Sequence, residues 1–279
     1  MKIVVTGSKG LIARELIQLL VEKYPDAHIL CADIGNEVSV DLRDGEMCEE
    51  LCNGADWVFH LAGIKGSPKR TNEKPIDFMV PMLQFDTNMI ASAQKCYVKK
   101  FLYTSSIAVL NPESDKYPAW AKQTSEKVIE AMGIQYPEGT EYCVVRPTNV
   151  YGRFDNFEAK DCMVVSDLCR KAKADGKLEV WGDGSQTRDF MNAKDCARAM
   201  ILVMEKMPNK PINLGTGKMH SIKDVADIIQ KELNIEVTYD NSKKNMGAKN
   251  KGMDITELEK LGFKPEVDLE TGVKEVLNV

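Results

Sequence analysis

The residue types best suited to chemistry lie in the middle of the chain, where a pair of serines precedes a lysine. Ser105 and Ser106 end the apolar run that begins at Phe101, and Lys122 follows in a stretch with helical spacing. A serine hydroxyl in such a place can hydrogen-bond a sugar or alcohol oxygen, while an ammonium can bind ribose hydroxyls and lower the pKa of a neighbouring phenol. Taken alone, paired serines are usually a cap or a turn and a helical lysine is usually a solvated charge, so the surrounding elements decide between the two interpretations.

A glycine-containing turn at the start of the chain predicts a site for a diphosphate. The apolar run at residues 2–5 leads directly into the segment TGSKGLIA at residues 6–13, which opens a stretch with helical spacing. Gly7 allows the chain to turn sharply, Gly10 lacks the Cβ that would block a pyrophosphate, and Ala13 lets helix and sheet pack closely. The first helical N–H groups lack intrahelical partners and favour an anion. The position of the turn, between a strand and a helix, makes it more specific than its glycines alone.

Asp33 predicts that the dinucleotide is NAD. It follows the second strand-like run, residues 28–32, and lies twenty residues beyond Ala13. A carboxylate at the tip of this strand can accept hydrogen bonds from the adenosine ribose hydroxyls, and its charge would repel the 2′-phosphate of NADP. The alternative is that Asp33 only begins a turn ahead of Gly35, as aspartate often does, and that basic residues such as Lys9 tolerate a 2′-phosphate.

Strand-like and helix-like periods alternate along the first 150 residues. This alternation predicts an α/β fold, a Rossmann-type doubly wound parallel sheet with helices on both faces, followed by a smaller α/β C-terminal substrate lobe. Ligands of such sheets bind beyond the carboxyl ends of the strands, where the groups named above would converge. The expected strands are residues 2–6, 28–32, 56–61, 101–105 and 141–146, and the expected helices are residues 11–23, 44–52, 76–99, with an interruption at Pro81, and 119–136.

Composition narrows the class of protein. The chain has 279 residues, 43% of them hydrophobic, which is enough for one large α/β domain or a domain with a smaller lobe. A net charge of −5 without a long basic block argues against a nucleic-acid partner. No apolar run approaches the roughly 20 residues that span a bilayer, so we expect no membrane partner and a soluble, cytoplasmic protein. The eight cysteines form no C-x-x-C pair and the three histidines lie far apart, so we expect reduced thiols and no metal site.

Several further motifs resemble those of the NAD-dependent nucleotide-sugar epimerase/dehydratase family, the extended short-chain dehydrogenases/reductases. Together with TGSKGLIA and Asp33 they cover nearly the whole chain: DLRD at 41–44, HLAG at 60–63, YTSS at 103–106, RPTNVYG at 146–152, WGDGSQTRDF at 181–190, NLGTG at 213–217 and a closing segment at 254–265. Several such motifs in the right order are more specific than any one of them. Within the family, residues 156–168 and 180–182 are similar to the GDP-fucose synthase branch, although Met163 stands where that branch carries a histidine acid, and the UDP-glucose 4-epimerase branch is the other candidate.

The resemblance implies NAD as the cofactor and a hydride transfer between a sugar carbon and the nicotinamide. By the same resemblance, the catalytic residues would be Ser106, Tyr117 and Lys122. The cofactor contacts would come from Gly7, Lys9, Gly10, Leu11, Ile12, Asp33, Asp41, Leu42, Leu61, Ala62, Gly63, Asn88, Thr104 and Lys122.

The resemblance also implies a nucleotide-diphosphate sugar as the substrate. Arg188 is similar to the arginine that binds the substrate diphosphate, and a guanidinium suits that anion. Asn149 is similar to the asparagine beside the sugar and the first phosphate, and Ser106 would contact the sugar oxygen. The alternative for Arg188 is a surface salt bridge with Asp183 or Asp189.

The family's organisation leads us to expect two lobes and a homodimer. The NAD-binding Rossmann domain would comprise residues 1–147 and 189–214, and the substrate-binding lobe residues 148–188 and 215–279. Dimers in the family form through the helices that correspond here to residues 76–99 and 119–136. The apolar side chains available for this contact are Met79, Met82, Phe85, Met89 and Ile90, although such a stripe is more often core than interface.

The chain departs from the family's Tyr-x-x-x-Lys motif at the catalytic tyrosine. The residue four positions before Lys122 is Pro118, and Tyr117 is one residue too early. Within an uninterrupted helix, a five-residue offset would turn Tyr117 about 140° away from Lys122. If the helix instead begins at Pro118, Tyr117 lies outside it and can approach the nicotinamide as a general base on a sugar hydroxyl. Ser105 would replace Ser106 if the strand register were shifted by one residue.

Three other interpretations of the function stay open. The fold can bind NAD and a nucleotide sugar without efficient catalysis, as the altered tyrosine spacing indicates. It can be an NAD(P)H-dependent nucleotide-sugar reductase. It can also be a reductase of an apolar carbonyl compound, although the motif around Arg188 argues against a substrate that has no diphosphate. The base, the sugar and the choice among epimerisation, dehydration and reduction are not decided by these motifs.

Overall fold

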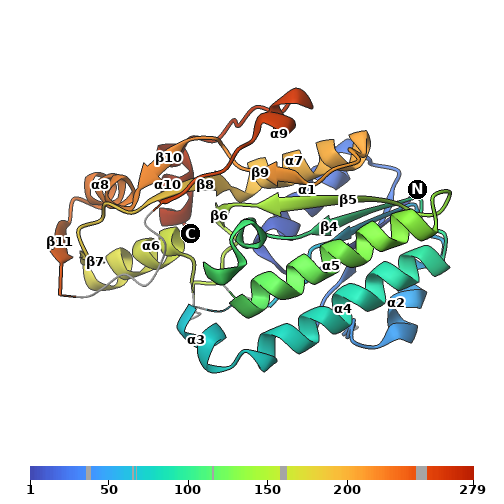
Figure 1. Cartoon of the computed structure of the whole chain (residues 1–279). Coiled ribbons are helices and arrows are strands. Elements are labelled where there is room, and N and C mark those ends of the chain that lie inside the picture. The colour runs from blue at the N-terminus through green and yellow to red at the C-terminus, as the bar shows by residue number, and fades with distance from the viewer. Residues whose placement is uncertain (36–38, 65, 67, 115, 158–161, 243–249) are drawn as a thin grey trace.

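The computed structural model of the chain describes all residues except 36–38, 65, 67, 115, 158–161 and 243–249. Six parallel strands form its larger sheet, in the order β2-β1-β3-β4-β5-β9 (Figure 1). They are β1 (Lys2–Thr6), β2 (His28–Ala32), β3 (Trp57–His60), β4 (Lys100–Thr104), β5 (Glu141–Pro147) and β9 (Ile212–Leu214). The predicted Rossmann-type α/β class is confirmed, and the first five strands match their predicted bounds to within one residue.

The order of the strands reverses at β1. The chain passes from β1 to β2 on one side of it and then returns to add β3 on the other side. The register pairs Val5 with Phe59 and Thr6 with His60, so β1 and β3 end level with each other. In doubly wound sheets, ligands bind in the crevice beyond the carboxyl ends of the strands at such a reversal. The topology therefore puts the turn after β1 at the expected ligand position.

Helices cover both faces of the larger sheet (Figure 1). Each helix turns an apolar stripe toward the sheet, as its periodicity predicts. No helix in the described part of the chain is both long and apolar enough to cross a membrane. On one face lie α1 (Leu11–Lys23) and α7 (Ala193–Lys206), and on the other lie α2 (Gly45–Cys52), α4 (Ile76–Lys95) and α5 (Lys116–Gln135).

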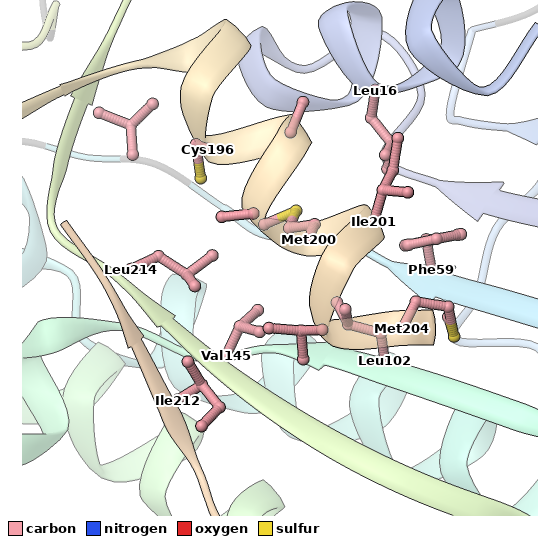
Figure 2. Close-up of a cluster of buried hydrophobic side chains, with 14 of the residues drawn as sticks. Leu16, Phe59, Leu102, Val145, Cys196, Met200, Ile201, Met204, Ile212 and Leu214 are labelled. Atoms are coloured by element: carbon pink, nitrogen blue, oxygen red, sulfur yellow. The ribbon is translucent and has the colours of Figure 1, made fainter. Parts of the chain in front are cut away.

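The core between α7 and the sheet is rich in methionine (Figure 2). Met200 and Met204 of α7 are fully buried in one cluster with Leu102 of β4 and Val145 of β5. Unbranched thioether side chains fill irregular gaps that branched residues leave. Leu16 of α1 belongs to the same cluster. This packing holds α1, and with it the turn that precedes α1, against the sheet.

On the opposite face, α4 runs unbroken from Ile76 to Lys95 with Pro81 inside it. The expected interruption at Pro81 and the expected extension to residue 99 are wrong, because a proline removes one backbone donor and the buried stripe holds the rest of the helix. The apolar side chains considered for a dimer contact belong largely to the chain's own core. Those that are buried are Met82, Phe85, Met89 and Ile90, and Met79 is partly buried beside them.

α5 begins at Lys116, so the expectation that Tyr117 lies outside the helix is wrong. Proline is tolerated in a first helical turn, where its missing N–H has no intrahelical partner, and the helix therefore does not have to begin at Pro118. Tyr117 follows the helical period and packs edge-on against Trp120, with ring centroids 5.8 Å apart. The period turns Tyr117 about 140° away from Lys122, whereas Pro118 shares a face with that lysine.

The smaller lobe is an α/β unit built around β8 (Thr187–Asn192), with a hydrophobic core of its own (Figure 1). β8 pairs with β10 in the antiparallel sense and with β6 and β12 in the parallel sense, while β7 and β11 form a separate parallel pair. The strands are β6 (Asn149–Tyr151), β7 (Lys177–Trp181), β10 (Met219–Ser221), β11 (Glu236–Asp240) and β12 (Asn250–Lys251), and the packed helices are α6 (Val164–Asp175), α8 (Ile222–Leu233) and α10 (Leu269–Leu277). Short helical segments elsewhere are α3 (Pro68–Glu73), α9 (Thr256–Lys260), η1 (Ile107–Leu110) and η2 (Pro112–Ser114).

Two segments pack differently from the expected division into lobes. β8 belongs to the smaller sheet, although the expected Rossmann domain includes residues 189–214. Conversely, Ile255, Leu258 and Phe263 lie within the expected lobe but are buried in the core beside the larger sheet. The chain therefore passes between the core beside the larger sheet and the core of the smaller lobe more often than the order of the motifs alone predicts.

Gly7, directly after β1, approaches the backbone after β3. Its φ is +65°, and a Cβ at this position would lie 2.8 Å from the nitrogen of Ala62. We expect Gly7→Ala to lower the free energy of unfolding by about 2–5 kcal/mol, since a left-handed φ costs about 1–2 kcal/mol and steric overlap adds about 1–3 kcal/mol. Urea unfolding followed by circular dichroism measures the loss.

Gly54 supplies the matched control for this experiment. Its φ is +67°, and a Cβ there would have nothing within 4 Å. Gly54→Ala should therefore lose only the conformational part of the free energy. Equal losses in the two variants would contradict the close approach of Gly7 to Ala62.

Candidate functional site

A cavity of about 860 Å³ opens at the carboxyl ends of β1, β2, β3 and β4 and continues past β5 to residues 154–156 and Met163. Most of the residues predicted from the sequence line it. They are Gly7, Lys9, Gly10, Leu11, Ile12, Asp33, Asp41, Leu42, Leu61, Ala62, Gly63, Thr104, Ser106 and Lys122. Four predicted residues, Asn88, Tyr117, Asn149 and Arg188, are not among the described residues of the lining.

The turn between β1 and α1 forms one wall of the cavity. The N–H of Gly10 donates to the carbonyl oxygen of Gly7 at 2.9 Å, and a Cβ on Gly10 would lie 3.0 Å from that oxygen. Gly10 is the N-cap of α1 and offers no side-chain cap, and the first turn of α1 has no acidic residue. Leu11 and Ile12 of this turn line the cavity. An uncapped helix N-terminus of this kind favours a phosphate group.

Asp33 lies beside this turn, at the end of β2. Its Oδ2 accepts a hydrogen bond from the N–H of Lys9 at 2.8 Å. The ammonium of Lys9 donates to the carbonyl oxygen of Gly35, in the loop after β2. The two contacts tie the turn to this loop and fix a carboxylate where the ribose of a dinucleotide would need an acceptor.

A further stretch of the wall is made by Asp41, Leu42 and Arg43. Hydrogen bonds from the side chain and N–H of Arg43 lower the pKa of Asp41, whose Oδ1 lies 2.9 Å from Arg43 Nε. Asn88 of α4 lies behind this stretch, and its Nδ2 donates to the carbonyl oxygens of Leu42 and Arg43 at 3.1 and 2.9 Å. Asn88 therefore supports the wall from behind, which differs from the direct cofactor contact that we expected.

Three hydroxyl side chains follow one another on the wall at the end of β4. Thr104 Oγ1 and Ser105 Oγ are buried without a hydrogen-bond partner in the described part of the chain. Ser106 is the N-cap of η1, and its Oγ accepts a hydrogen bond from the N–H of Ala108 at 3.1 Å. Buried polar atoms without partners are uncommon in folded proteins. Their position on the cavity wall fits a bound molecule that hydrogen-bonds them.

Behind this wall, a fully buried carboxylate holds the lysine in place. Asp86 of α4 accepts hydrogen bonds at Oδ2 from Tyr103 at 2.5 Å, Ser125 at 2.9 Å and Lys122 at 3.4 Å. Its Oδ1 lies 3.0 Å from His60 Nε2. The ammonium of Lys122 also lies 4.6 Å from the centre of the Tyr103 ring, and the lysine side chain is only 9% exposed. Lys122 thus meets the cavity from a fixed position.

The protonation states of this network follow from its donors. Burial alone would raise the pKa of Asp86, but Lys122, His60 and Tyr103 outweigh burial and lower that pKa, so the carboxylate is ionised. A carboxylate only accepts, and His60 Nε2 therefore carries a proton. Burial lowers the pKa of His60 and keeps the ring neutral. Burial, reinforced by Asp86, raises the pKa of Tyr103, so its phenol stays protonated and donates.

The same network reaches the turn after β1. In neutral His60 the second ring nitrogen, Nδ1, is an acceptor, and it receives the hydroxyl of Thr6 at 2.8 Å. Thr6 Oγ1 in turn accepts the N–H of Ala62 at 3.3 Å. One chain of hydrogen bonds therefore connects the ends of β1 and β3 to Lys122 on α5.

Pro118 occupies the place where the Tyr-x-x-x-Lys motif puts a phenol. It lines the cavity together with Ala119 and Lys122 of the same helix. Tyr117 points elsewhere, and the described lining contains no tyrosine. The geometry therefore does not support Tyr117 as the general base.

Asn149 and Arg188 lie near β8, in the smaller lobe. The Nδ2 of Asn149 donates to the carbonyl oxygen of Asp189 at 3.2 Å. Arg188 is 9% exposed, and its guanidinium donates to the carbonyl oxygen of Thr187 at 2.7 Å. The carboxylate of Asp189 accepts hydrogen bonds from the loop after β9. Contact of Asn149 and Arg188 with a substrate stays a prediction.

Asp86 is the residue of the site that sequence reasoning misses. It belongs to none of the motifs, but it lies on the apolar stripe of α4, four residues after Met82 and three before Met89. A carboxylate on a buried stripe is rare unless it is paired, so this position is itself a signal. His60 belongs to the HLAG motif, but its bond to a carboxylate on α4 has no signal in that motif.

The comparisons with known proteins agree with the motifs. Residues 3–215 match the model of the NAD dependent epimerase/dehydratase family. The chain is 32% identical over 246 residues to a probable GDP-L-fucose synthase 1 of Oryza sativa subsp. japonica, which covers 78% of this chain and 74% of the rice protein. It is 28% identical to a putative UDP-glucose 4-epimerase of Methanocaldococcus jannaschii, over 99% of this chain and 97% of that protein.

The fold comparison points the same way. The UDP-N-acetylglucosamine 4-epimerase from Methanobrevibacter ruminantium M1, solved in complex with UDP-N-acetylmuramic acid, superposes with a TM-score of 0.86 and 26% identity over 99% of this chain and 97% of its own. The resemblance read from the motifs is confirmed, and with it NAD as the cofactor. The chain belongs to the NAD dependent epimerase/dehydratase family.

Proposed function

We propose that this protein is an enzyme that transfers a hydride between NAD and a sugar carbon of a nucleotide-diphosphate sugar. The observation that carries the proposal is one continuous cavity. The phosphate-binding turn and Asp33 line one end of it, Ser106 and Lys122 line its middle, and residues 154–156 line the end near the smaller lobe. A dinucleotide and a second nucleotide can meet in such a cavity with a sugar between them.

The residues of the cavity fit NAD. The uncapped N-terminus of α1 would hold the diphosphate, Asp33 would accept the adenosine ribose hydroxyls, and Lys122 would bind the second ribose. The unpartnered hydroxyls of Thr104 and Ser105 are buried where the nicotinamide end would lie. When bound, NAD takes a hydride from a carbon or returns one to it.

The substrate would lie between Ser106 and the smaller lobe. Arg188 would bind its diphosphate, because a guanidinium matches phosphate oxygens in geometry and charge, and Asn149 would contact the sugar. The named relatives include a GDP-sugar synthase and a UDP-sugar epimerase, so both bases are candidates for this chain.

A specific observation favours a second candidate function, a protein that binds NAD and a nucleotide sugar with little turnover. Pro118 takes the place of the phenol on the cavity wall, and general acid–base help of that kind is worth about 10²–10⁴ in rate. Stabilisation by a nucleotide sugar in a thermal melt without any hydride transfer would support this candidate.

The carboxylate of Asp33 leads us to expect that NAD binds more tightly than NADP, since its charge repels a 2′-phosphate. Asp33→Asn should narrow the ratio of the two dissociation constants by roughly tenfold, about 1.4 kcal/mol. Isothermal titration with each cofactor measures the ratio, and Asp26→Asn, an exposed position after α1, is the control. Tighter binding of NADP by the unaltered protein would contradict the assignment.

For Arg188, we expect that Arg188→Gln raises the KM for the nucleotide sugar by about 10–100-fold, because a charge-assisted contact contributes about 1.5–3 kcal/mol. The dissociation constant of NAD should stay within about twofold. Steady-state rates with UDP-glucose and GDP-mannose as probes measure the change, and Lys177→Gln, an exposed cation of β7, is the control. An unchanged KM for the sugar that turns over would remove Arg188 from the substrate site.

A homodimer also belongs to this proposal, through side chains other than those expected from the sequence. Ile76 and Val80 of α4 are 65% and 42% exposed, and Trp120 of α5 is 36% exposed. We expect light scattering after gel filtration to show a dimer, and Val80→Glu to shift it toward monomer without changing NAD binding. A wild-type monomer at micromolar concentration would contradict this contact.

A further inference from the structure

The cavity holds an ammonium at the place where a phenol is missing. Lys122 is the ionisable side chain that α5 contributes to the described lining, on the face that it shares with Pro118. The other charged side chains of the lining near α1 are Lys9, which follows β1, and Asp33, Asp41 and Arg43, which follow β2. The hydroxyls of Thr104, Ser105 and Ser106 at the end of β4 also line the cavity, and they are weak acids that act as hydrogen-bond partners more than as proton donors.

The surroundings of Lys122 decide in which direction it can move a proton. Its ammonium faces the ionised carboxylate of Asp86 at 3.4 Å, and loss of its proton would leave that buried carboxylate with less compensation. In the resting site this side chain is therefore an ammonium, which has a proton to donate and no lone pair with which to accept one. A phenol held by a neighbouring lysine, in contrast, can act in either direction.

We propose that Lys122 is the proton donor for reduction of a nucleotide keto-sugar, and that this reduction is the reaction favoured by the site. The inference rests on the proposed function and narrows it. In the step, the carbonyl carbon takes a hydride from the reduced nicotinamide while the carbonyl oxygen takes a proton from Lys122 Nζ. The products are the alcohol, the oxidised cofactor and a neutral amine. The amine regains its proton from water in the open cavity.

The direction also places the reaction in a sequence. A reduction consumes a keto-sugar, so an oxidation or dehydration of a nucleotide sugar has to supply it. The reduced cofactor is oxidised in each turnover. In an epimerisation, by contrast, the hydride returns to the sugar from which it came, and the cofactor is unchanged overall.

Asp86 acts in this scheme as a positioning residue. It is held by His60 of β3, Tyr103 of β4 and Ser125 of α5, so it cannot turn away from Lys122. The charged pair nearest to this group, Glu126 of α5 and Arg146 of β5, is bonded internally, with Arg146 Nε 2.9 Å from Glu126 Oε1.

Two carboxylates elsewhere on the lining are rivals for the role. Asp155 accepts hydrogen bonds from Ser166 Oγ at 2.6 Å and from the N–H of Asn156 at 2.9 Å, which is the behaviour of an acceptor. Asp77 lines the cavity from the first turn of α4. Neither belongs to the helical face that Pro118 and Lys122 share.

The test measures oxidation of NADH by two probes, UDP-4-keto-6-deoxyglucose and GDP-4-keto-6-deoxymannose, and reduction of NAD by UDP-glucose and GDP-mannose. The unaltered protein should oxidise NADH with one keto-sugar and show at least about 100-fold slower reduction of NAD. Lys122→Arg keeps the charge beside Asp86 but donates its proton poorly, and should lower kcat by about 10²–10⁴. NADH affinity, read separately by protein fluorescence, should change far less. Lys127→Arg, an exposed lysine of the same helix, is the control.

The solvent isotope effect distinguishes proton donation from a structural role. With Lys122 as donor, turnover slows in deuterium oxide, and this effect should vanish in Lys122→Arg. Asp86→Asn removes the charge that holds the ammonium in place and should lower kcat, while the dissociation constant of NADH changes far less. If Asp86→Asn does not fold, Tyr103→Phe removes one donor to the same carboxylate and should lower kcat by a smaller factor.

Pro118→Tyr restores the Tyr-x-x-x-Lys spacing and tests the direction in which the site moves a proton. It should raise reduction of NAD by the matching nucleotide sugar at least tenfold, since a phenol can accept the alcohol proton. The proposal is overturned by normal turnover of Lys122→Arg, by loss of turnover in Tyr117→Phe or Asp155→Asn, or by equally fast NAD reduction in the unaltered protein. A protein that binds NADH but transfers no hydride to either probe overturns the proposed function itself.

Discussion

The buried carboxylate of Asp86 is the constraint around which the site is arranged. An ionised carboxylate taken out of water costs several kcal/mol unless it is paired and hydrogen-bonded, so each neighbouring element has to bring a donor to it. β3 brings His60, β4 brings Tyr103, and α5 brings Ser125 and Lys122. The donors that satisfy the carboxylate also fix the position of α5, and with it the ammonium that meets the cavity.

Around this network, ordinary α/β packing positions the rest. Parallel pairing brings β1 and β3 to the same edge, and the absence of a side chain at Gly7 lets the turn after β1 lie against the backbone after β3. The methionine-rich core under α7 holds α1 in place, and α1 presents its uncapped N-terminus to the cavity. The turn after β1 and the ammonium of Lys122 are thus held at one cavity by two different forces, apolar burial on one face of the sheet and charge pairing on the other.

Family membership and catalytic chemistry rest on different amounts of the chain. The match to the family covers residues 3–215, so no single substitution would change it. The proton chemistry depends on one helical position. Pro118 stands there on the cavity wall, where the family's motif has a phenol.

The sequence by itself determined the first five strands of the larger sheet, the glycine-containing turn after β1 and the place of Asp33, because these depend on local periodicity and on residues adjacent in the chain. It also showed that Tyr117 stands one position too early. Only the tertiary structure decided which way Tyr117 points, since proline is accepted at more than one position of a first helical turn. It alone revealed Asp86, because the partners of that carboxylate come from β3, β4 and α5, and no pattern along a single segment records which distant donors will surround a buried charge.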